Sequence, residues 1–339
     1  MLQKPSTFKF LVRSLMGLRQ PSPVEGKERG FTLIELLVVV LIAGGIISGL
    51  MYLVVELLTA DRVEASRTQT QQEMQMALDY ISTELRQAVY VYNEECMSDT
   101  AFGSVADEDS NYCPGLYNHI PADLTDADEN PILAFWKQQQ LPLSVRNACN
   151  PNTAPCITGH SYALIVYTLD TSDSPTWSGG ARIRRYALTQ FQANGDETAG
   201  YVNPGSFNRD FRSWPFYTEE GEDTRSNQQN GNPGGTAQVL VDFVDDRVRG
   251  DMDATQCPGG YTLTSDETVP ADFANSFYGC VRDMEGTIEG GQNRDTLLFL
   301  RGNPSGRPGM GTNVGRTNFL PTLETQVLSR PVLEKQPVN

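Results

Sequence analysis

One carboxylate, Glu35, stands near the start of a long run of apolar residues, where its surroundings strongly restrict its chemistry. An unpaired carboxylate is costly in an apolar medium, so Glu35 is expected to meet a cation or to reach an interface. A basic residue and a glycine, Arg29 and Gly30, come just before this run, and Phe31 begins it. Because glycine has no side chain, the backbone at Gly30 can enter a narrow binding site.

The rest of the sequence offers no catalytic motif. It contains no G-x-S-x-G, no H-E-x-x-H and no phosphate-binding P-loop, so we predict that the protein is not an enzyme. With only two histidines, imidazole ligands are scarce, and we predict neither a metal nor another cofactor. Two acidic clusters are interpreted as solvated surface, with calcium as the alternative, although Pro131 stands where a calcium loop requires glycine. The clusters are Asp126, Asp128 and Asn130, and Asp245, Asp246, Asp251 and Asp253.

Charge is distributed unevenly along the chain. Residues 1–30 hold six Lys and Arg against two Glu and so carry +4; since the whole chain carries −16, the remaining residues carry −20. A basic start before an acidic body indicates that the two parts face different environments. An acidic body also lacks the basic patch that a phosphate backbone needs, so we predict no nucleic-acid partner.

All six cysteines lie well beyond residue 60, and none forms a C-x-x-C pair, which disfavours zinc. An even number in an acidic, turn-rich region favours disulfides made in an oxidising compartment, with buried thiols as the alternative. The sequence leaves the pairing open, although Cys149 and Cys156 are close enough to pair locally. The candidates are Cys96, Cys113, Cys149, Cys156, Cys257 and Cys280.

Residues 36–55 form an uncharged run of twenty residues. At about 1.5 Å of rise per residue, a helix of this length spans roughly 30 Å, the thickness of a bilayer's hydrocarbon core. A secretory signal peptide would have a shorter run followed by a small-residue cleavage site, so this run is expected to stay in the mature protein. The basic residues before it predict a cytoplasmic N-terminus and an exported body. Gly45 and Gly49 have a spacing that permits close helix approach.

Apolar residues recur at three- and four-residue steps after the uncharged run, which predicts that the helix continues as an amphipathic segment. We therefore expect one helix with a transmembrane first half, residues 31–58, and a second half, residues 59–92, that covers a sheet. Residues 93–301 are expected to form a β-rich head. Residues 302–339, which are rich in proline and glycine, are expected to form an irregular tail.

Four segments of the head are rich in β-branched and aromatic residues and predict an antiparallel sheet, which gives an α+β fold. The first two are predicted to pair as a hairpin. Three long irregular segments, about 96–159, 192–236 and 250–294, are expected in the head, and the first and third bear the cysteines. The predicted strands are Ser161–Leu169, Ala181–Phe191, Gln238–Val244 and Thr296–Arg301.

Aromatic residues concentrate in one loop of the head, between residues 201 and 217. We interpret them as rings that pack the loop against the sheet, with stacking on sugar rings as the alternative. No motif supports the sugar-binding interpretation. The residues are Tyr201, Phe207, Phe211, Trp214, Phe216 and Tyr217.

The stretch KERGFTLIELL, residues 27–37, resembles the prepilin cleavage motif of type IV pilins and type II secretion pseudopilins in residue type, order and spacing. The resemblance implies a cytoplasmic leader over residues 1–30, cleavage between Gly30 and Phe31 by a prepilin peptidase, and N-methylation of Phe31. Cleavage would leave a positive amine one helical turn from Glu35. The resemblance implies that Glu35 pairs with this amine on a neighbouring subunit; snorkelling to the interface and pairing with its own amine are the alternatives.

Further stretches resemble the pseudopilins linked to hormogonium polysaccharide secretion in filamentous cyanobacteria. They are residues 31–92, the runs VLVDFVDD and TLLFLRGNP, and the closing FLPTLETQVLSRPVLEKQ. More broadly, the chain is similar to PilW-type and J-type minor pilins. The resemblance implies a type IV pilin-like fold and a minor pseudopilin that helps assemble a filament and supports polysaccharide secretion and gliding motility.

The same resemblance implies partners and a location. The partners are other pilins or pseudopilins contacted through the N-terminal helix, the prepilin peptidase, an inner-membrane assembly platform and, as a further candidate, polysaccharide. The location is the inner membrane, with a single span and a periplasmic head, or the outside of the cell within a pilus. The alternative function is a membrane-anchored head that binds glycans or surfaces.

Overall fold

The computed structural model describes residues 30–106, 111–149, 156, 159–205, 211–247, 257–265, 276–282, 295–310 and 320–329. The predictions that fall on residues 1–29, on Phe207 and on Asp251 and Asp253 lie outside this part of the chain. The chain divides into two compact units, Met1–Leu58 and Thr59–Asn339, which are described separately.

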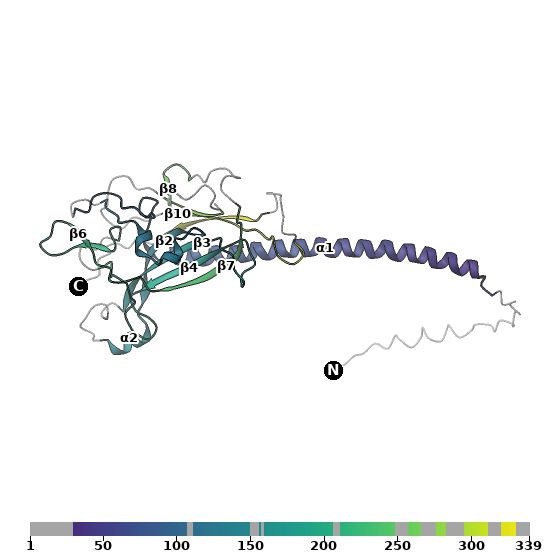
Figure 1. Ribbon diagram of the computed structural model, residues 1–339, viewed down its shortest axis with the longest axis horizontal. Helices are drawn as coiled ribbons and strands as arrows, with labels where there is room; N and C mark the ends of the chain where they lie inside the picture. The colour runs from purple at the N-terminus through teal and green to yellow at the C-terminus, as the bar shows by residue number, and fades with distance from the viewer. Residues whose placement is uncertain are drawn as a thin grey trace, which may run out of the picture. The chain divides into compact units, whose positions relative to one another are not determined.

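Helix α1 runs from Leu33 to Leu85, so the expectation of one helix reaching Tyr92 was wrong at its C-terminal end. After a short turn, Ala88–Val91 forms strand β1, which pairs antiparallel with β2, Glu129–Gln140. Figure 1 labels α1 and β2. The apolar spacing that favoured helix is also compatible with a short strand, because the residues from Val89 to Val91 are β-branched or aromatic. Pairing with β2 in the sheet makes these residues a strand and not a continuation of the helix.

The first sheet has five antiparallel strands in the order β1-β2-β3-β4-β7. Its central strands are long, and β3 and β4 form the predicted hairpin with Tyr167 opposite Arg185. The remaining strands of this sheet are β2 (Glu129–Gln140), β3 (His160–Asp170), β4 (Ala181–Thr189) and β7 (Thr236–Val244).

Strand β2 corrects the expectation of an irregular segment over residues 96–159. Its N-terminal half carries Pro131, which lacks a backbone N–H and argues against a central strand. The structure accommodates this proline at an irregularity, because the register of β2 against β3 shifts between Pro131 and Leu133. The following residues, up to Trp136, are buried and pair regularly.

A second sheet of four antiparallel strands has the order β11-β10-β9-β8. Strand β11, Thr322–Leu328, corrects the expectation of an irregular tail after residue 301, since it pairs with β10 along its whole length. Its alternating pattern turns Val327 into the core and leaves Leu328 exposed, as a strand with one covered face requires. The other strands of this sheet are β8 (Tyr261–Leu263), β9 (Phe277–Arg282) and β10 (Asp295–Arg301).

Shorter elements lie in the connections. Four strands lie within the segments expected to be irregular. Strands β5 (Phe216–Thr218) and β6 (Arg225–Asn227) form a small sheet of their own, whereas β8 and β9 belong to the second sheet. The remaining short elements are η1 (Leu116–His119), η2 (Ala122–Leu124) and α2 (Leu143–Ala148). The four strands predicted from β-branched and aromatic runs are confirmed as β3, β4, β7 and β10.

Two apolar clusters cover the two faces of the first sheet. One lies between the sheet, the last turns of α1 and the second sheet, with Met74, Ile81 and Phe135 fully buried. The other packs the connecting loops onto the opposite face around Trp136 and Trp214. A sheet buried on both faces explains why the central strands read as continuous apolar runs.

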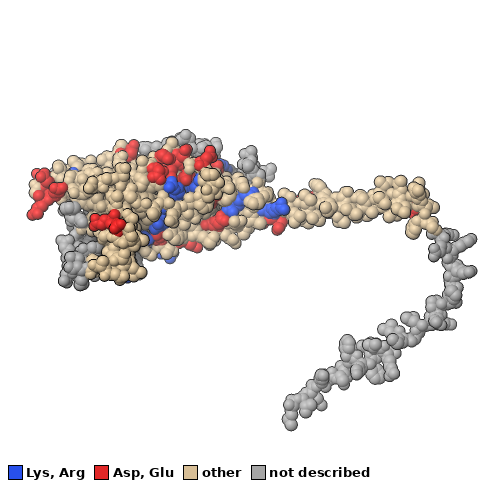
Figure 2. Space-filling view, turned by 60° about the horizontal axis from the view of Figure 1, so that its bottom comes forward, with Lys and Arg blue, Asp and Glu red and all other residues tan. Residues whose placement is uncertain are grey.

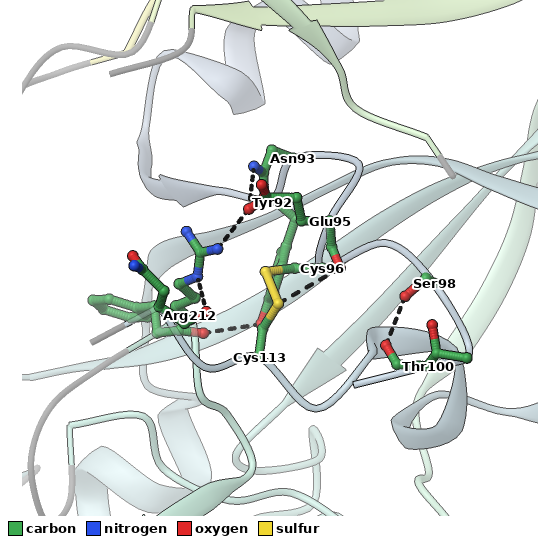
Figure 3. The surroundings of a disulfide bond; sticks show 10 residues. Tyr92, Asn93, Glu95, Cys96, Ser98, Thr100, Cys113 and Arg212 are labelled. Carbon is green, nitrogen blue, oxygen red and sulfur yellow. Dashed lines mark hydrogen bonds and ion pairs between the residues drawn. A yellow bond between two sulfur atoms is a disulfide. The ribbon is translucent and has the colours of Figure 1, made fainter. Parts of the chain in front are cut away.

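Three disulfides join all six cysteines, which confirms the preference for disulfides over buried thiols. Cys149 pairs with Cys156, as their proximity in the sequence suggests. The other two pairs are Cys96–Cys113, shown in Figure 3, and Cys257–Cys280. Cys96–Cys113 and Cys149–Cys156 each close a connection between strands. Cys257–Cys280 attaches the connection before β8 to β9, which carries Cys280.

Candidate functional site

The first turn of α1 is organised by the side chain of Thr32. The backbone N–H of Glu35 donates to the Thr32 carbonyl oxygen at 3.1 Å and lies 3.4 Å from its hydroxyl oxygen, and Leu36 N–H donates to the same carbonyl. A threonine that receives the N–H of a glutamate three residues later is an N-cap, and the pair has the spacing of a capping box. Thr32 therefore fixes where the helix begins and places Glu35 in its first turn.

The residues before the helix are open to solvent. Phe31 is 79% exposed, and a side chain added at Gly30 would meet nothing within 4 Å. The fold of this chain therefore does not itself require glycine at position 30. Both residues are accessible to another protein, and cleavage between them stays a prediction, as does methylation of Phe31.

The first half of α1 presents its apolar side chains outward on all sides. Every residue from Leu33 to Leu58 is exposed, and Leu33, for example, is 85% exposed. Figure 2 draws this part of α1 almost entirely in the colour of uncharged residues, and Glu35 is its only charged residue up to Val55. The helix is long and apolar enough to cross a membrane. A surface of this kind is stable only in lipid or against other apolar helices.

At its other end α1 is held by one buried carboxylate. Glu84, in the last turn, accepts hydrogen bonds from Lys137 on β2 at 2.5 Å and from Tyr167 on β3 at 2.6 Å. It also accepts two from the Arg185 guanidinium on β4, each 2.8 Å long. One side chain thus ties the helix to three neighbouring strands.

The ion cluster around Glu84 sets its protonation state. Burial alone raises the pKa of the Glu84 carboxyl, but hydrogen bonds from Arg185, Lys137 and Tyr167 outweigh burial and bring the pKa from 4.5 to about 2. Burial and the neighbouring Glu84 carboxylate raise the pKa of the Tyr167 hydroxyl. The tyrosine therefore stays a hydrogen-bond donor and the glutamate stays ionised throughout the physiological range.

The described aromatic residues of the loop between 201 and 217, which do not include Phe207, pack into the head, as the preferred interpretation predicted. Trp214 is 1% exposed, its indole N–H donates to the Val202 carbonyl at 2.8 Å, and its ring lies edge-on to Trp136 at 5.2 Å. Phe211 contacts Tyr162, with 5.2 Å between ring centroids. In the described residues this loop offers no tryptophan face for stacking on a sugar.

The acidic clusters are engaged in contacts within the chain. Asp126 accepts the N–H of Asp128, and Asn130 accepts the hydroxyl of Tyr117. Asp245 is fully buried and pairs with Arg301 at 2.6 Å. Within the part of the chain that the structure describes, no group of three or more His, Cys, Asp or Glu is placed to hold a metal ion.

Comparison with known proteins identifies one family model. Residues 26–51 match the prokaryotic N-terminal methylation motif, which covers Gly30, Phe31, Glu35 and the start of the apolar run. No curated protein and no solved structure matches the chain. The motif supports a type IV pilin-like protein that is processed by a prepilin peptidase, a class that is structural and not enzymatic. The α+β architecture, a long apolar helix followed by antiparallel sheets with disulfides in the loops, is pilin-like.

Sequence reasoning missed two features of the site. The Thr-x-x-Glu spacing of Thr32 and Glu35 is a recognisable capping signature, and it was available in the sequence. The role of Glu84 could not be recognised in the sequence, because Asp79 and Glu73 on the same helix look equivalent to it. Only the register of three strands singles out the carboxylate that meets Lys137 and Arg185.

Proposed function

We propose that the chain is a minor pseudopilin of a type IV pilus-like apparatus. In this proposal the chain is cut between Gly30 and Phe31, methylated at Phe31 and held in the inner membrane by residues 36–55, with the head on the periplasmic side. The observation that carries the proposal is the methylation motif over residues 26–51, which extends into a helix whose apolar side chains face outward. Such a helix is suited to lie in lipid and to pass from there into a bundle of like helices.

The role of Glu35 follows from electrostatics. A carboxylate among apolar side chains is costly unless a cation neutralises it, and the new amine at Phe31 of a neighbouring subunit supplies one. The capping contact with Thr32 fixes the backbone of Glu35, although its side chain stays exposed. The pairing of Glu35 with a neighbouring amine would therefore set the axial register between subunits.

The finer assignment rests on sequence resemblance. The described part of the head contains three sheets, of five, four and two strands, together with three disulfides and long connections. A head of this kind crowds a tight helical lattice, which favours a minor subunit that primes or caps a filament. The resemblance to pseudopilins of hormogonium polysaccharide secretion supports a role in polysaccharide export and gliding motility. The alternative, a glycan-binding head, loses its candidate tryptophan, since Trp214 is buried.

A pair of matched substitutions tests this proposal. Glu35→Ala should block incorporation into the filament while cleavage and methylation of Phe31 continue, as measured by mass spectrometry of the mature N-terminus. Glu56→Ala removes the carboxylate at the far end of the apolar run and serves as the control, with normal incorporation expected. Normal assembly of Glu35→Ala, or mature protein that still begins at Met1 in cells with an active peptidase, would contradict the proposal.

A further inference from the structure

The segment 302–310, called the strap below, lies against the first turns of α1 that belong to the head (Figure 1). The hydroxyl of Ser66 donates to the Pro308 carbonyl oxygen at 2.8 Å. The Arg307 guanidinium forms an ion pair with Glu73, two turns further along the helix. These two polar contacts join segments that are more than 230 residues apart in the chain.

Close backbone approach completes the contact between the strap and the helix. Gly309 adopts a φ of +88°, and a Cβ at this position would lie 2.6 Å from the Cβ of Arg62. Glycine is therefore needed here both for the backbone conformation and for the space. The strap thus touches α1 along three turns, from Arg62 to Glu73.

The strap begins at a corner where the two sheets meet. The Asn303 N–H donates to the Phe243 carbonyl oxygen at 2.8 Å, and the Asp245 N–H donates to the Arg301 carbonyl oxygen at 3.0 Å. The carboxylate of Asp245 receives Arg301 at 2.6 Å and Arg247 at 3.0 Å. This end of the strap is consequently fixed to both sheets.

The helix beneath the strap buries little apolar surface. From Thr59 to Glu73 the buried residues of α1 are Ser66 and Thr70, both polar, and the Thr70 hydroxyl donates within the helix to the Ser66 carbonyl oxygen. The apolar cluster of the head begins only at Met74. Because apolar burial is the main force that fixes a helix to a body, residues 62–73 depend on the strap in a way that 74–85 do not.

Two unfavourable features lie where the strap packs against β7. Phe243, whose ring lies 3.9 Å from the Arg307 guanidinium, has a φ of 61°, the only positive φ of a non-glycine residue in the described chain. Left-handed backbone at a bulky residue is strained and is retained where the surroundings enforce it. In addition, the buried Nε of Arg307 lacks a hydrogen-bond partner among the contacts of the described residues. The unsatisfied Nε opposes the ion pair and the cation–π contact that hold the strap closed, whereas the strain at Phe243 belongs to β7, against which Arg307 packs.

We propose that the strap is a releasable clasp that sets how much of α1 the head holds. Closed, it fixes residues 62–73 to the head; open, it frees this segment, about 18 Å of helix at about 1.5 Å per residue, while Glu84 and the apolar cluster keep 74–85 in place. The clasp therefore changes how much of the helix after Thr59 is fixed to the head. This property goes beyond the proposed assembly function and does not depend on it.

Two buried serines on α1 provide the test, since Ser66 lies under the strap and Ser82 lies where the helix meets the apolar cluster. In the full chain in detergent micelles, Ser66→Cys and Ser82→Cys are each labelled with a small thiol reagent, with and without Arg307→Met. Intact native disulfides are verified by mass spectrometry. The expected result is at least tenfold faster labelling of the Ser66→Cys thiol when Arg307→Met is present, with the Ser82→Cys thiol unchanged.

The outcomes separate a clasp from a merely structural contact. Equal acceleration at both positions would mean that Arg307 supports the whole head, and no acceleration at Ser66→Cys would mean that the strap does not control access; either result overturns the proposal. Glu73→Gln, at a carboxylate that is 29% exposed, opens the same ion pair from the helix side and gives a second variant if Arg307→Met does not fold. Arg212→Met, which removes an ion pair with Glu95 away from the strap, is the control and should leave both rates unchanged.

Discussion

The guanidinium of Arg185 on β4 forms two hydrogen bonds of 2.8 Å to the Glu84 carboxylate in the last turn of α1. Both side chains are largely buried, and Lys137 and Tyr167 complete the shell around the carboxylate. A buried ion pair contributes most clearly when one partner is removed, because the other then remains as an uncompensated charge. The attachment of α1 to the first sheet therefore depends on this pair as well as on apolar packing.

Arg185→Met should lower the free energy of unfolding of the head by about 3 kcal/mol or more. The substitution removes both N–H groups that Arg185 donates to Glu84 and leaves the carboxylate buried. The double variant Glu84→Met with Arg185→Met should recover part of this loss. Arg146→Met removes an exposed arginine on α2 and should change stability by less than about 0.5 kcal/mol. Denaturant unfolding followed by tryptophan fluorescence measures all three, and equal losses for Arg185→Met and Arg146→Met would refute a special role of the pair.

Two buried carboxylates give the stability of the head a pH dependence of opposite sign. The pKa of Glu84 is lowered from 4.5 to about 2, so its contribution is complete above pH 4.5 and is lost as the pH falls toward 2. Burial raises the pKa of Glu129 from 4.5 to about 7, against the opposing hydrogen bond of Thr168 and charge of Arg184. The folded state therefore binds a proton more tightly at Glu129 than the unfolded state does, and stability falls between pH 4.5 and 7.

Substitution separates the two carboxylates. Glu129→Gln should remove the decrease in stability between pH 4.5 and 7, and Glu84→Gln should flatten the acid limb between pH 4.5 and 2. The measurement is the unfolding midpoint in denaturant at closely spaced pH values. A Glu129→Gln profile that keeps the original slope above pH 4.5 would show that another group titrates there.

The disulfides should stabilise the head according to the loops that they close. Cys257 and Cys280 are 23 residues apart, whereas Cys149 and Cys156 are 7 apart. Loop-closure entropy then gives about 3.4 kcal/mol for the longer loop and about 2.4 kcal/mol for the shorter one. Replacing each pair by serines and comparing denaturant midpoints checks the order, and a larger loss from the Cys149–Cys156 pair would contradict it.

The sequence allowed the apolar helix, its membrane-spanning length and four of the strands to be predicted, because each depends on a local pattern. Strand β3 is recognisable from its β-branched and aromatic residues alone. Strand β2 was missed because Pro131 argues against a strand, and only the partner β3 provides the bulge that accepts it. The end of α1 was misplaced because residues 88–91 suit helix and strand alike, and pairing with β2 decides.

The candidate site shows the same division between local and non-local information. Gly30, Phe31 and Glu35 were selected by their order along the chain, and residues 26–51 match the methylation motif. The contacts of Glu84 and Arg307 join residues that are 101 and 234 positions away in the sequence, at Arg185 and Glu73 respectively. Such pairs follow from strand order and loop path, which a single sequence does not contain.

A comparison of two tryptophans tests the interpretation of the aromatic loop. Trp214 is 1% exposed and packs against Trp136, whereas Trp177 lies in the connection between β3 and β4 and is 40% exposed. Trp214→Ala should cost about 3–5 kcal/mol of stability because it leaves a large cavity. Trp177→Ala should cost less than about 0.5 kcal/mol, because surface substitutions away from special features are usually tolerated.

If the loop instead served to stack on sugars, Trp214 would be partly free and its removal would be well tolerated. Trp214→Ala would then leave the denaturant midpoint near that of the unsubstituted chain while abolishing retention on immobilised polysaccharide. We expect the reverse, a marked loss of stability together with unchanged retention at temperatures where the variant is still folded. Circular dichroism and a polysaccharide pull-down on the same preparation measure both quantities, and Trp177→Ala controls for the loss of an exposed ring.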